Sequence, residues 1–148
     1  MDEARRAAVA AMLGARSVAV VGASARAGSF GERMVTEALR GSARVHLVNP
    51  RYHRIGKLAC ASTLSDLDEP VDVALLGVPD SALLDQLRAA ADAGARSAVL
   101  FGSAHGLRDE VRTVAADAGM AVCGAGCMGF VNNAVGVRAL GYLEPDPL

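Results

Sequence analysis

The stretch SVAVVGASARAGSF, residues 17–30, begins as a run of small and β-branched apolar residues and changes at Gly22 into alanine, serine and glycine. The apolar run indicates a buried β-strand, and the small residues after it predict a tight turn into a helix that begins near Gly31. Such a turn brings backbone N–H groups and the positive end of a helix to one point, which suits a phosphate group. The residues also allow a simpler interpretation, in which the glycines only make the strand-to-helix turn.

The rest of the chain repeats this alternation of strand and helix. Apolar runs predict four more strands, and amphipathic segments predict helices, three of which end at a glycine placed for the left-handed conformation. The predicted strands cover residues 17–22, 44–49, 72–78, 97–102 and 120–124, and the predicted helices cover residues 4–13, 31–41, 80–94 and 106–119, with Gly41, Gly94 and Gly119 at the last three ends. A long excursion at residues 49–70 should contain one short strand near residues 58–60 and a helical turn near residues 65–67.

These features predict an α/β fold of the Rossmann-like type, a doubly wound and mainly parallel sheet with helices on both faces, in a single domain. The chain has 148 residues, 52% hydrophobic but only 3% aromatic, so the core must consist mainly of Ala, Val and Leu. We place the domain at residues 1–142. Residues 143–148 contain two prolines and two acidic residues, and are expected to start a linker to downstream domains that are absent from this chain.

The composition argues against several classes of function. A net charge of −1 does not suit a protein that binds nucleic acid through its phosphates. No apolar run approaches the roughly 18 residues that cross a membrane. The odd number of cysteines (Cys60, Cys123 and Cys127) predicts reduced thiols in a cytoplasmic protein, and two neighbouring thiols are too few ligands to predict a zinc site. No combination of Ser, His and acidic residues predicts a catalytic group.

The glycine spacing does not match a common nucleotide motif. Gly22, Gly28 and Gly31 fit neither G-x-G-x-x-G nor the phosphate loop that ends in Lys-Ser/Thr. Ser24 and Ser29 nevertheless add hydroxyl donors to the turn, and Arg26 adds a fixed positive charge. We therefore expect a phosphate-binding turn of another family.

The end of the second strand indicates which nucleotide to expect. An NAD-binding domain carries an acidic residue there, whereas this chain has Asn49-Pro50-Arg51, with Arg54 and Lys57 close behind. Cations at this place favour a nucleotide with an additional ribose phosphate, which means NADP or coenzyme A (CoA). The alternative is that they are ordinary solvent-exposed charges.

The end of the third strand offers two interpretations as well. Val78-Pro79 can form one wall of an adenine pocket, or it can be a plain strand-to-helix joint, since proline favours the first turn of a helix. Asp80 is then expected to cap the following helix.

Five segments, taken together, resemble a known family. The segments RSVAVVGAS, VNPRY, VDVALLGVP, GARSAVLF and CGAGCMGFVN occur in that order between residues 16 and 132. They are similar to the CoA-binding domain of ADP-forming (NDP-forming) acyl-CoA synthetases, the group related to the succinyl-CoA synthetase α subunit. The resemblance extends from residue 16 to about residue 142 and implies a Rossmann-like domain that holds CoA across the ends of its strands.

The resemblance also implies a set of CoA-binding residues. It places the phosphates of CoA on residues 24–27, just after Gly22. The adenosine end is placed near the end of the second strand and the end of the third strand, and the pantetheine is placed past residues 101–105 toward the loop at residues 124–129. The residues implied are Gly22, Ser24, Ala25, Arg26, Ala27, Asn49, Pro50, Arg51, Val78, Pro79, Ser103 and Cys127.

In complete members of the family, a phosphorylated histidine on a following domain and an ATP-grasp domain convert acyl-CoA, ADP and phosphate to acid, ATP and CoA. The resemblance therefore implies that ATP, ADP and Mg²⁺ act only through domains absent from this chain, which alone should bind and not catalyse. Two alternatives stay open: a CoA-sensing or nucleotide-sensing regulatory domain fused to an acyltransferase, and an NADP-binding oxidoreductase domain. One departure from the family pattern is Gly126, which stands where the family loop has asparagine.

Overall fold

A computed structural model describes residues 2–141 of the chain. Its four α-helices and one short 3-10 helix are α1 (Glu3–Leu13), α2 (Phe30–Arg40), η1 (Leu64–Asp66), α3 (Asp80–Asp92) and α4 (Arg108–Ala118). Its strands are β1 (Ser17–Val21), β2 (Arg44–Val48), β3 (Arg54–Ile55), β4 (Leu58–Ala61), β5 (Val73–Leu76), β6 (Ser97–Leu100), β7 (Ala121–Gly124), β8 (Gly129–Asn132) and β9 (Val137–Leu140). The five strands and four α-helices predicted from the sequence are all present.

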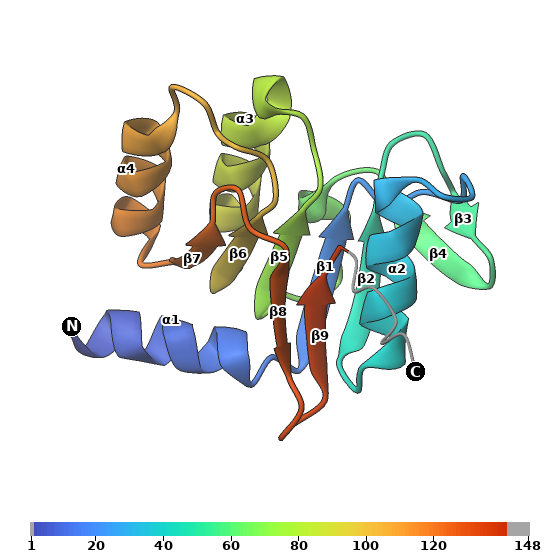
Figure 1. Ribbon diagram of the computed structural model, residues 1–148, viewed down its shortest axis with the longest axis horizontal. Coiled ribbons are helices and arrows are strands. Elements are labelled where there is room, and N and C mark those ends of the chain that lie inside the picture. The colour runs from blue at the N-terminus through green and yellow to red at the C-terminus, as the bar shows by residue number, and fades with distance from the viewer. Residues whose placement is uncertain (1, 142–148) are drawn as a thin grey trace, which may run out of the picture.

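The strands form a seven-stranded sheet in the order β3-β4-β2-β1-β5-β6-β7, and a separate β8–β9 hairpin (Figure 1). Six of the seven strands are mutually parallel, and only β3 runs against its neighbour β4. The chain passes from β1 to β2 on one side and returns through β5 on the other, so the direction of winding reverses at β1. This reversal is the point at which doubly wound sheets bind ligands, beyond the carboxyl ends of the strands.

Two apolar clusters fill the space on the two faces of the sheet. On one face α3 and α4 pack side by side, and Leu83 and Leu87 of α3 are fully buried there. On the other face α1, α2 and the β8–β9 hairpin supply Met12, Met34 and Val137. β1 and β5 are buried along their whole length, which explains why their sequences are apolar without alternation.

The β8–β9 hairpin was not predicted, and two contacts fix it to the helices beside it. The carboxylate of Glu37 in α2 accepts two hydrogen bonds from the guanidinium of Arg138 in β9, at 2.6 and 3.1 Å. The side-chain amide of Asn132, at the end of β8, donates to the backbone carbonyl of Leu13 at 2.6 Å. The hairpin therefore belongs to the domain and directly follows the loop at residues 124–128.

Two other details differ from expectation. The excursion after β2 contains the two-residue strand β3 as well as β4, because residues 54–55 turn back and pair with residues 58–59. Gly94 and Gly119 adopt the predicted left-handed conformation, but Gly41 does not, since its φ is −86°. A side chain at Gly41 would come within 2.6 Å of the carbonyl oxygen of Gly136 in the hairpin turn, so close approach explains this glycine.

Within residues 2–141, no helix is both long enough and apolar enough to cross a membrane. The predicted domain boundary at residue 142 and the predicted linker at residues 143–148 lie outside the described residues.

Candidate functional site

The predicted site residues follow the carboxyl ends of five parallel strands, which meet at one edge of the sheet. Gly22 to Ala27 follow β1, Asn49 to Arg51 follow β2, and Val78 and Pro79 lie just beyond β5. Ser103 lies in the loop after β6, and Cys127 lies after β7. Segments that are far apart in the sequence are thus brought to the same edge, as the sequence predicted.

The loop between β1 and α2 is fixed by its own hydrogen bonds. Ser29 is the N-cap of α2: its hydroxyl accepts from the backbone N–H of Glu32 at 3.2 Å and donates to the carbonyl of Arg26 at 2.7 Å. The carboxylate of Glu32 accepts from the N–H of Gly28 at 3.1 Å, and the hydroxyl of Ser24 accepts from the N–H of Arg26 at 3.0 Å. Ser29, which was expected to contact the ligand, is therefore used to cap the helix.

Glycines allow this loop to pack closely against the sheet. Gly22 has φ +93°, and a Cβ there would overlap the carbonyl oxygen of Gly77. A Cβ on Gly31, at the start of α2, would overlap the carbonyl oxygen of Gly22 and would come within 3.0 Å of the backbone nitrogen of Ser24. The helix therefore begins directly against the end of β1, which only glycine permits.

Tyr52 contacts this loop from the far side and was missing from the predicted site. Its hydroxyl lies 3.2 Å from the Ser24 hydroxyl. This hydrogen bond is the main reason that the pKa of Tyr52 lies below its ordinary value, and the positive charges of Arg26 and Arg51 lower the pKa further. A tyrosine directly after the Asn-Pro-Arg segment was the available sequence signal.

Asn49 connects the ends of β1 and β2. Its side-chain amide donates to the carbonyl of Ala23 at 2.8 Å, and its side-chain oxygen accepts from the N–H of Arg51 at 2.9 Å. Both ends of the amide are thus used to hold two backbone segments in place. Asn49 therefore fixes the backbone at Arg51 against the end of β1.

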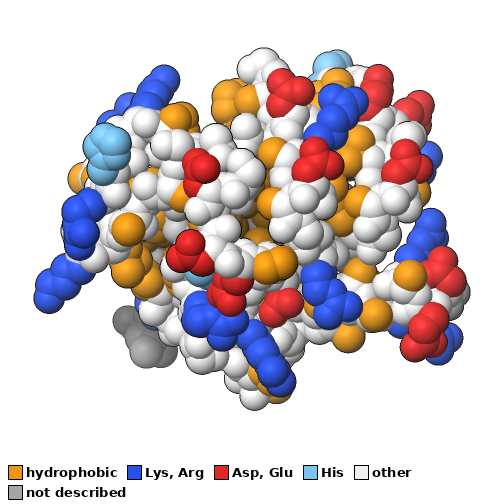
Figure 2. Space-filling view, turned by 180° about the vertical axis from the view of Figure 1, so that it is seen from behind, with side chains coloured by type: hydrophobic (Ala, Val, Ile, Leu, Met, Phe, Trp, Pro, Cys, Tyr) orange, Lys and Arg blue, Asp and Glu red, His pale blue; other side chains and the backbone are white. Residues whose placement is uncertain are grey.

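A cleft of about 340 Å³ lies between these two loops. Its walls include five of the predicted residues and add Tyr52 and the start of α2; its lining residues are Gly22, Ser24, Arg26, Ser29, Phe30, Gly31, Asn49, Arg51 and Tyr52. Arg26 and Arg51 are exposed on its rim, and further Lys and Arg side chains project from the neighbouring edge formed by β3 and β4 (Figure 2). The cleft combines hydroxyl groups, positive charge and a helix N-terminus, which is the chemistry of a phosphate site.

An apolar cavity of about 320 Å³ shares Phe30 with this cleft. Val78, Gly77, Phe101 and Gly102 complete its lining, and the rings of Phe30 and Phe101 meet edge to face with centroids 5.0 Å apart. Val78 therefore lies in an apolar wall, whereas Pro79 is the N-cap residue of α3. The pair of cavities offers a polar compartment next to an apolar one.

Asp80 has a different role from the predicted helix cap. It is the first residue of α3, and its carboxylate accepts hydrogen bonds from the Ser103 hydroxyl at 3.0 Å and from the N–H groups of Ala104 and His105 at 3.2 and 3.3 Å. These bonds, the one from Ser103 first, hold the pKa of Asp80 below its ordinary value. Ser103 and Asp80 together shape the loop after β6.

The loop at residues 124–128 places Cys127 at the ends of β6 and β7. The Cys127 thiol donates to the carbonyl of Leu100 at 3.5 Å and lies 3.8 Å from the thiol of Cys123. Burial raises the pKa of Cys123 to about 11, and the neighbouring Cys127 contributes to the shift. Gly126, at the position where the resemblance implies an asparagine, has φ +68° with open space around its Cβ position, a conformation that asparagine also tolerates.

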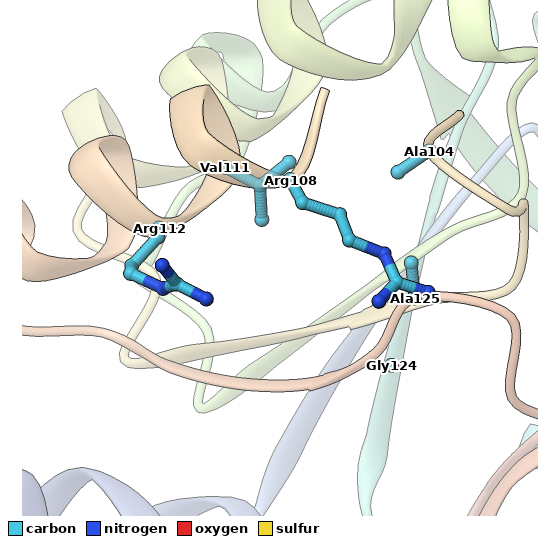
Figure 3. Close-up of a pocket in the computed structure, with 6 residues that line it drawn as sticks. All are labelled: Ala104, Arg108, Val111, Arg112, Gly124 and Ala125. Carbon is cyan, nitrogen blue, oxygen red and sulfur yellow. The ribbon is translucent and has the colours of Figure 1, made fainter. Parts of the chain in front are cut away.

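A further cavity of about 310 Å³ lies between this loop and α4. The guanidinium of Arg108 extends across it toward Ala125, and Arg112 stands on the same helix (Figure 3). Ala104, Val111 and Gly124 complete the lining.

Among the described residues, no group of three or more His, Cys, Asp or Glu side chains could hold a metal ion.

We expect Ser24→Ala to raise the pKa of Tyr52 toward its ordinary value of about 10, because the Ser24 hydroxyl stabilises the phenolate by a hydrogen bond. The measurement is an absorbance titration of the phenolate in a Tyr142→Phe background, which leaves one tyrosine. Ser42→Ala is the matched control, since Ser42 bonds to the carbonyl of Val135 in the hairpin turn. An unchanged pKa of Tyr52 in Ser24→Ala would contradict the contact.

Comparison with known proteins gives a consistent picture. A family model described as CoA binding domain matches residues 16–133. Trans-feruloyl-CoA synthase FCS1, from an unidentified prokaryote, is 29% identical over 147 residues, which are 93% of this chain and 20% of that protein. The ADP-forming acetate–CoA ligase of Methanocaldococcus jannaschii is 22% identical over 130 residues, which are 84% of this chain and 18% of the ligase.

A solved structure agrees with both matches. The dinucleotide-forming acetyl-coenzyme A synthetase 1 of Ca. Korarchaeum cryptofilum, in complex with phosphate and ADP, superimposes with a TM-score of 0.77 at 28% identity. The match covers 84% of this chain and 29% of that one. This chain spans about a fifth of the length of the curated relatives named above.

Proposed function

This chain belongs to the CoA-binding domain family, whose model matches residues 16–133, and from that membership we propose that it binds CoA in the cleft between the loops after β1 and β2. The domain is homologous to the CoA-binding region of ADP-forming acyl-CoA synthetases. The single observation that carries the proposed location is the cleft itself, where two arginines, the Ser24 hydroxyl and the start of α2 converge. The same homology favours CoA over NADP as the ligand.

We assign the pyrophosphate of CoA to the turn after Gly22. The residues present fit a phosphate. Gly22 and Gly31 let the loop backbone pack closely against the start of α2, and Arg26 supplies a positive charge at the rim of the cleft. Among the described residues, neither Arg26 nor Arg51 has a side-chain hydrogen bond or ion pair that would compete for its guanidinium. The loop is already ordered by Ser24, Ser29 and Glu32, so little ordering is required when the ligand binds.

We assign the remaining parts of CoA along the strand ends. The ribose phosphate is expected at Arg51, and the adenine is expected near Asn49, Pro50 and the apolar wall at Val78. The pantetheine is expected to pass Phe101 and Ser103 toward Cys127. When bound, CoA supplies a thiol that carries an acyl group, and the residues of this chain only hold and orient it.

Arg51→Ala is expected to raise the dissociation constant of CoA at least about tenfold, because a charge-assisted hydrogen bond to a phosphate is worth about 1.5–3 kcal/mol. Dephospho-CoA lacks the ribose phosphate, and its affinity should change less than about twofold. The measurement is a calorimetric titration of the chain with CoA, dephospho-CoA and NADP.

Arg54→Ala is the control for charge alone, because the Arg54 side chain donates to the carbonyl of Lys57 and does not line the cleft. Equal losses of CoA and dephospho-CoA in Arg51→Ala would remove Arg51 from the ribose phosphate site. Binding of NADP without CoA would contradict the proposed ligand.

We further propose that the whole protein is an NDP-forming acyl-CoA synthetase, in which a phosphohistidine-type domain and an ATP-grasp domain accompany this one. The ADP-forming ligase of Methanocaldococcus jannaschii supports this, since this chain corresponds to 18% of its length. ATP, ADP and Mg²⁺ would then act outside this domain. The acid–CoA ligation and the cytoplasmic location are predictions for the complete protein.

A further inference from the structure

Two thiols are in contact at the end of the sheet, beside the loop at residues 124–128. Cys123 is the third residue of β7, and Cys127 lies four positions later in the turn before β8. Their sulfur atoms are 3.8 Å apart, both side chains are partly buried, and both cysteines are free. The third cysteine, Cys60, lies in β4 on the other side of β1.

The local packing brings these two sulfurs together. Both thiols pack against the apolar cluster that includes Phe101 and Phe130, and both stay partly exposed. The absence of a side chain at Gly124 leaves room for the Cys127 sulfur, since a Cβ there would come within 3.1 Å of it. The turn therefore positions a thiol pair, whereas a single buried cysteine would serve as a small apolar residue.

We propose that Cys123 and Cys127 form a reversible dithiol–disulfide centre, whose oxidant is a small-molecule disulfide such as CoA disulfide. In the first step the Cys127 thiolate attacks one sulfur of the reagent, whose S–S bond breaks and releases one thiol. In the second step the Cys123 thiolate attacks the Cys127 sulfur and releases the second thiol. The two cysteines lose two protons and two electrons, and the reagent is reduced to two thiols.

The order of the two steps follows from the surroundings of the thiols. The thiolate is the reactive form, and burial holds the pKa of Cys123 near 11, so little of it ionises near neutral pH. Cys127 therefore attacks the incoming disulfide, and Cys123 then attacks the Cys127 sulfur of the resulting mixed disulfide and releases the second thiol.

Oxidation should also affect CoA binding, an expectation that rests on the proposed function. A bond to Cys123 removes the Cys127 thiol from the carbonyl of Leu100 and ties the turn to β7. The pantetheine thiol is expected at this turn, so the oxidised chain should bind CoA more weakly than the reduced chain.

The experiment treats the chain with CoA disulfide or glutathione disulfide, alkylates the remaining thiols, and locates every disulfide by mass spectrometry of peptides. We expect a Cys123–Cys127 bond with both reagents and an alkylated Cys60. Cys123→Ser should stop at a mixed disulfide on Cys127, and Cys60→Ser should behave like the unsubstituted chain. Alkylation of both Cys123 and Cys127, or reaction mainly at Cys60, would overturn the proposal.

A CoA titration of the reduced chain separates this proposal from the proposed function. If the reduced chain does not bind CoA but glutathione disulfide still joins the two cysteines, the CoA site is wrong and the dithiol centre stands. If the chain binds CoA and the two cysteines stay separate, the dithiol centre is wrong. Because the unsubstituted chain gives both results, neither depends on how well a cysteine variant folds.

Discussion

Gly31→Ala is expected to lower the free energy of unfolding by about 2–3 kcal/mol and to weaken CoA binding at least about tenfold. The added methyl group would overlap the carbonyl oxygen of Gly22 and press on the backbone of Ser24, so α2 or the loop must move. No flexible side chain can absorb the overlap, because two of its three nearest atoms belong to the backbone. Urea denaturation measures the stability, and calorimetry measures the affinity.

Gly14→Ala is the control, since Gly14 caps α1 with φ −108° and its nearest contact for a Cβ is 3.3 Å away. Its effect should stay within about 1 kcal/mol, with CoA affinity unchanged. A stable Gly31→Ala protein with full CoA affinity would show that the loop after β1 does not require this close approach and does not hold the ligand.

Glu37→Ala is expected to destabilise the domain by about 3–5 kcal/mol, because it leaves the guanidinium of Arg138 without its partner in a mostly buried position. The side chains of Glu37 and Arg138 are only 9% and 17% exposed. Alanine favours helix at least as well as glutamate, so the loss comes from the ion pair and not from α2 itself. Urea denaturation with a two-state fit provides the measurement.

The matched control is Asp85→Ala, which breaks the Asp85–Arg88 pair on α3, where the two side chains are 84% and 55% exposed. That change should cost less than about 1 kcal/mol, as surface pairs do. Replacing both members of the buried pair, as in Glu37→Met with Arg138→Leu, should recover much of the loss. If Glu37→Ala and Asp85→Ala cost the same, the pair does not hold the hairpin on α2.

The parallel sheet and the side on which the ligand binds could be predicted because they follow from hydrophobic periodicity. The five strands β1, β2, β5, β6 and β7 are short; β1, β5 and β6 are buried along their whole length, and β2 and β7 only in part. Right-handed crossovers then leave only a few possible topologies, and their carboxyl ends share one edge. The twelve predicted residues consequently fall in loops at that edge, although their contacts with CoA remain predictions.

Side-chain partners could not be predicted, since they depend on distances across the sequence. Asp80 has the sequence position of a helix cap, but the loop after β6 brings Ser103 and two N–H groups to its carboxylate. Tyr52 lies beside Ser24 only because β2 follows β1 in the sheet. Gly41 has the sequence position of a left-handed cap, yet the unpredicted hairpin explains why it is glycine.

The hairpin itself was missed because its signal is local and weak. Its strands cover only residues 129–132 and 137–140, with a turn that contains neither Asn-Gly nor Asp-Gly. One strand begins with glycine, which lowers the expectation of a strand. The charged residue Arg138 within an otherwise apolar segment was a usable indication, since it pairs with a buried acid.

The position of α1 has a consequence for how the chain folds. α1 is the first helix in the sequence, but it packs against β6 and β7, the last two strands of the main sheet. β1 likewise needs β5 to complete its second edge. During synthesis, an N-terminal portion that ends before β5 lacks both the strands against which α1 packs and the strand that pairs with the second edge of β1. Contacts between residues far apart in the sequence also slow folding. The transition state is therefore expected to require most of the chain at once, so that folding begins only after the C-terminal strands have been made.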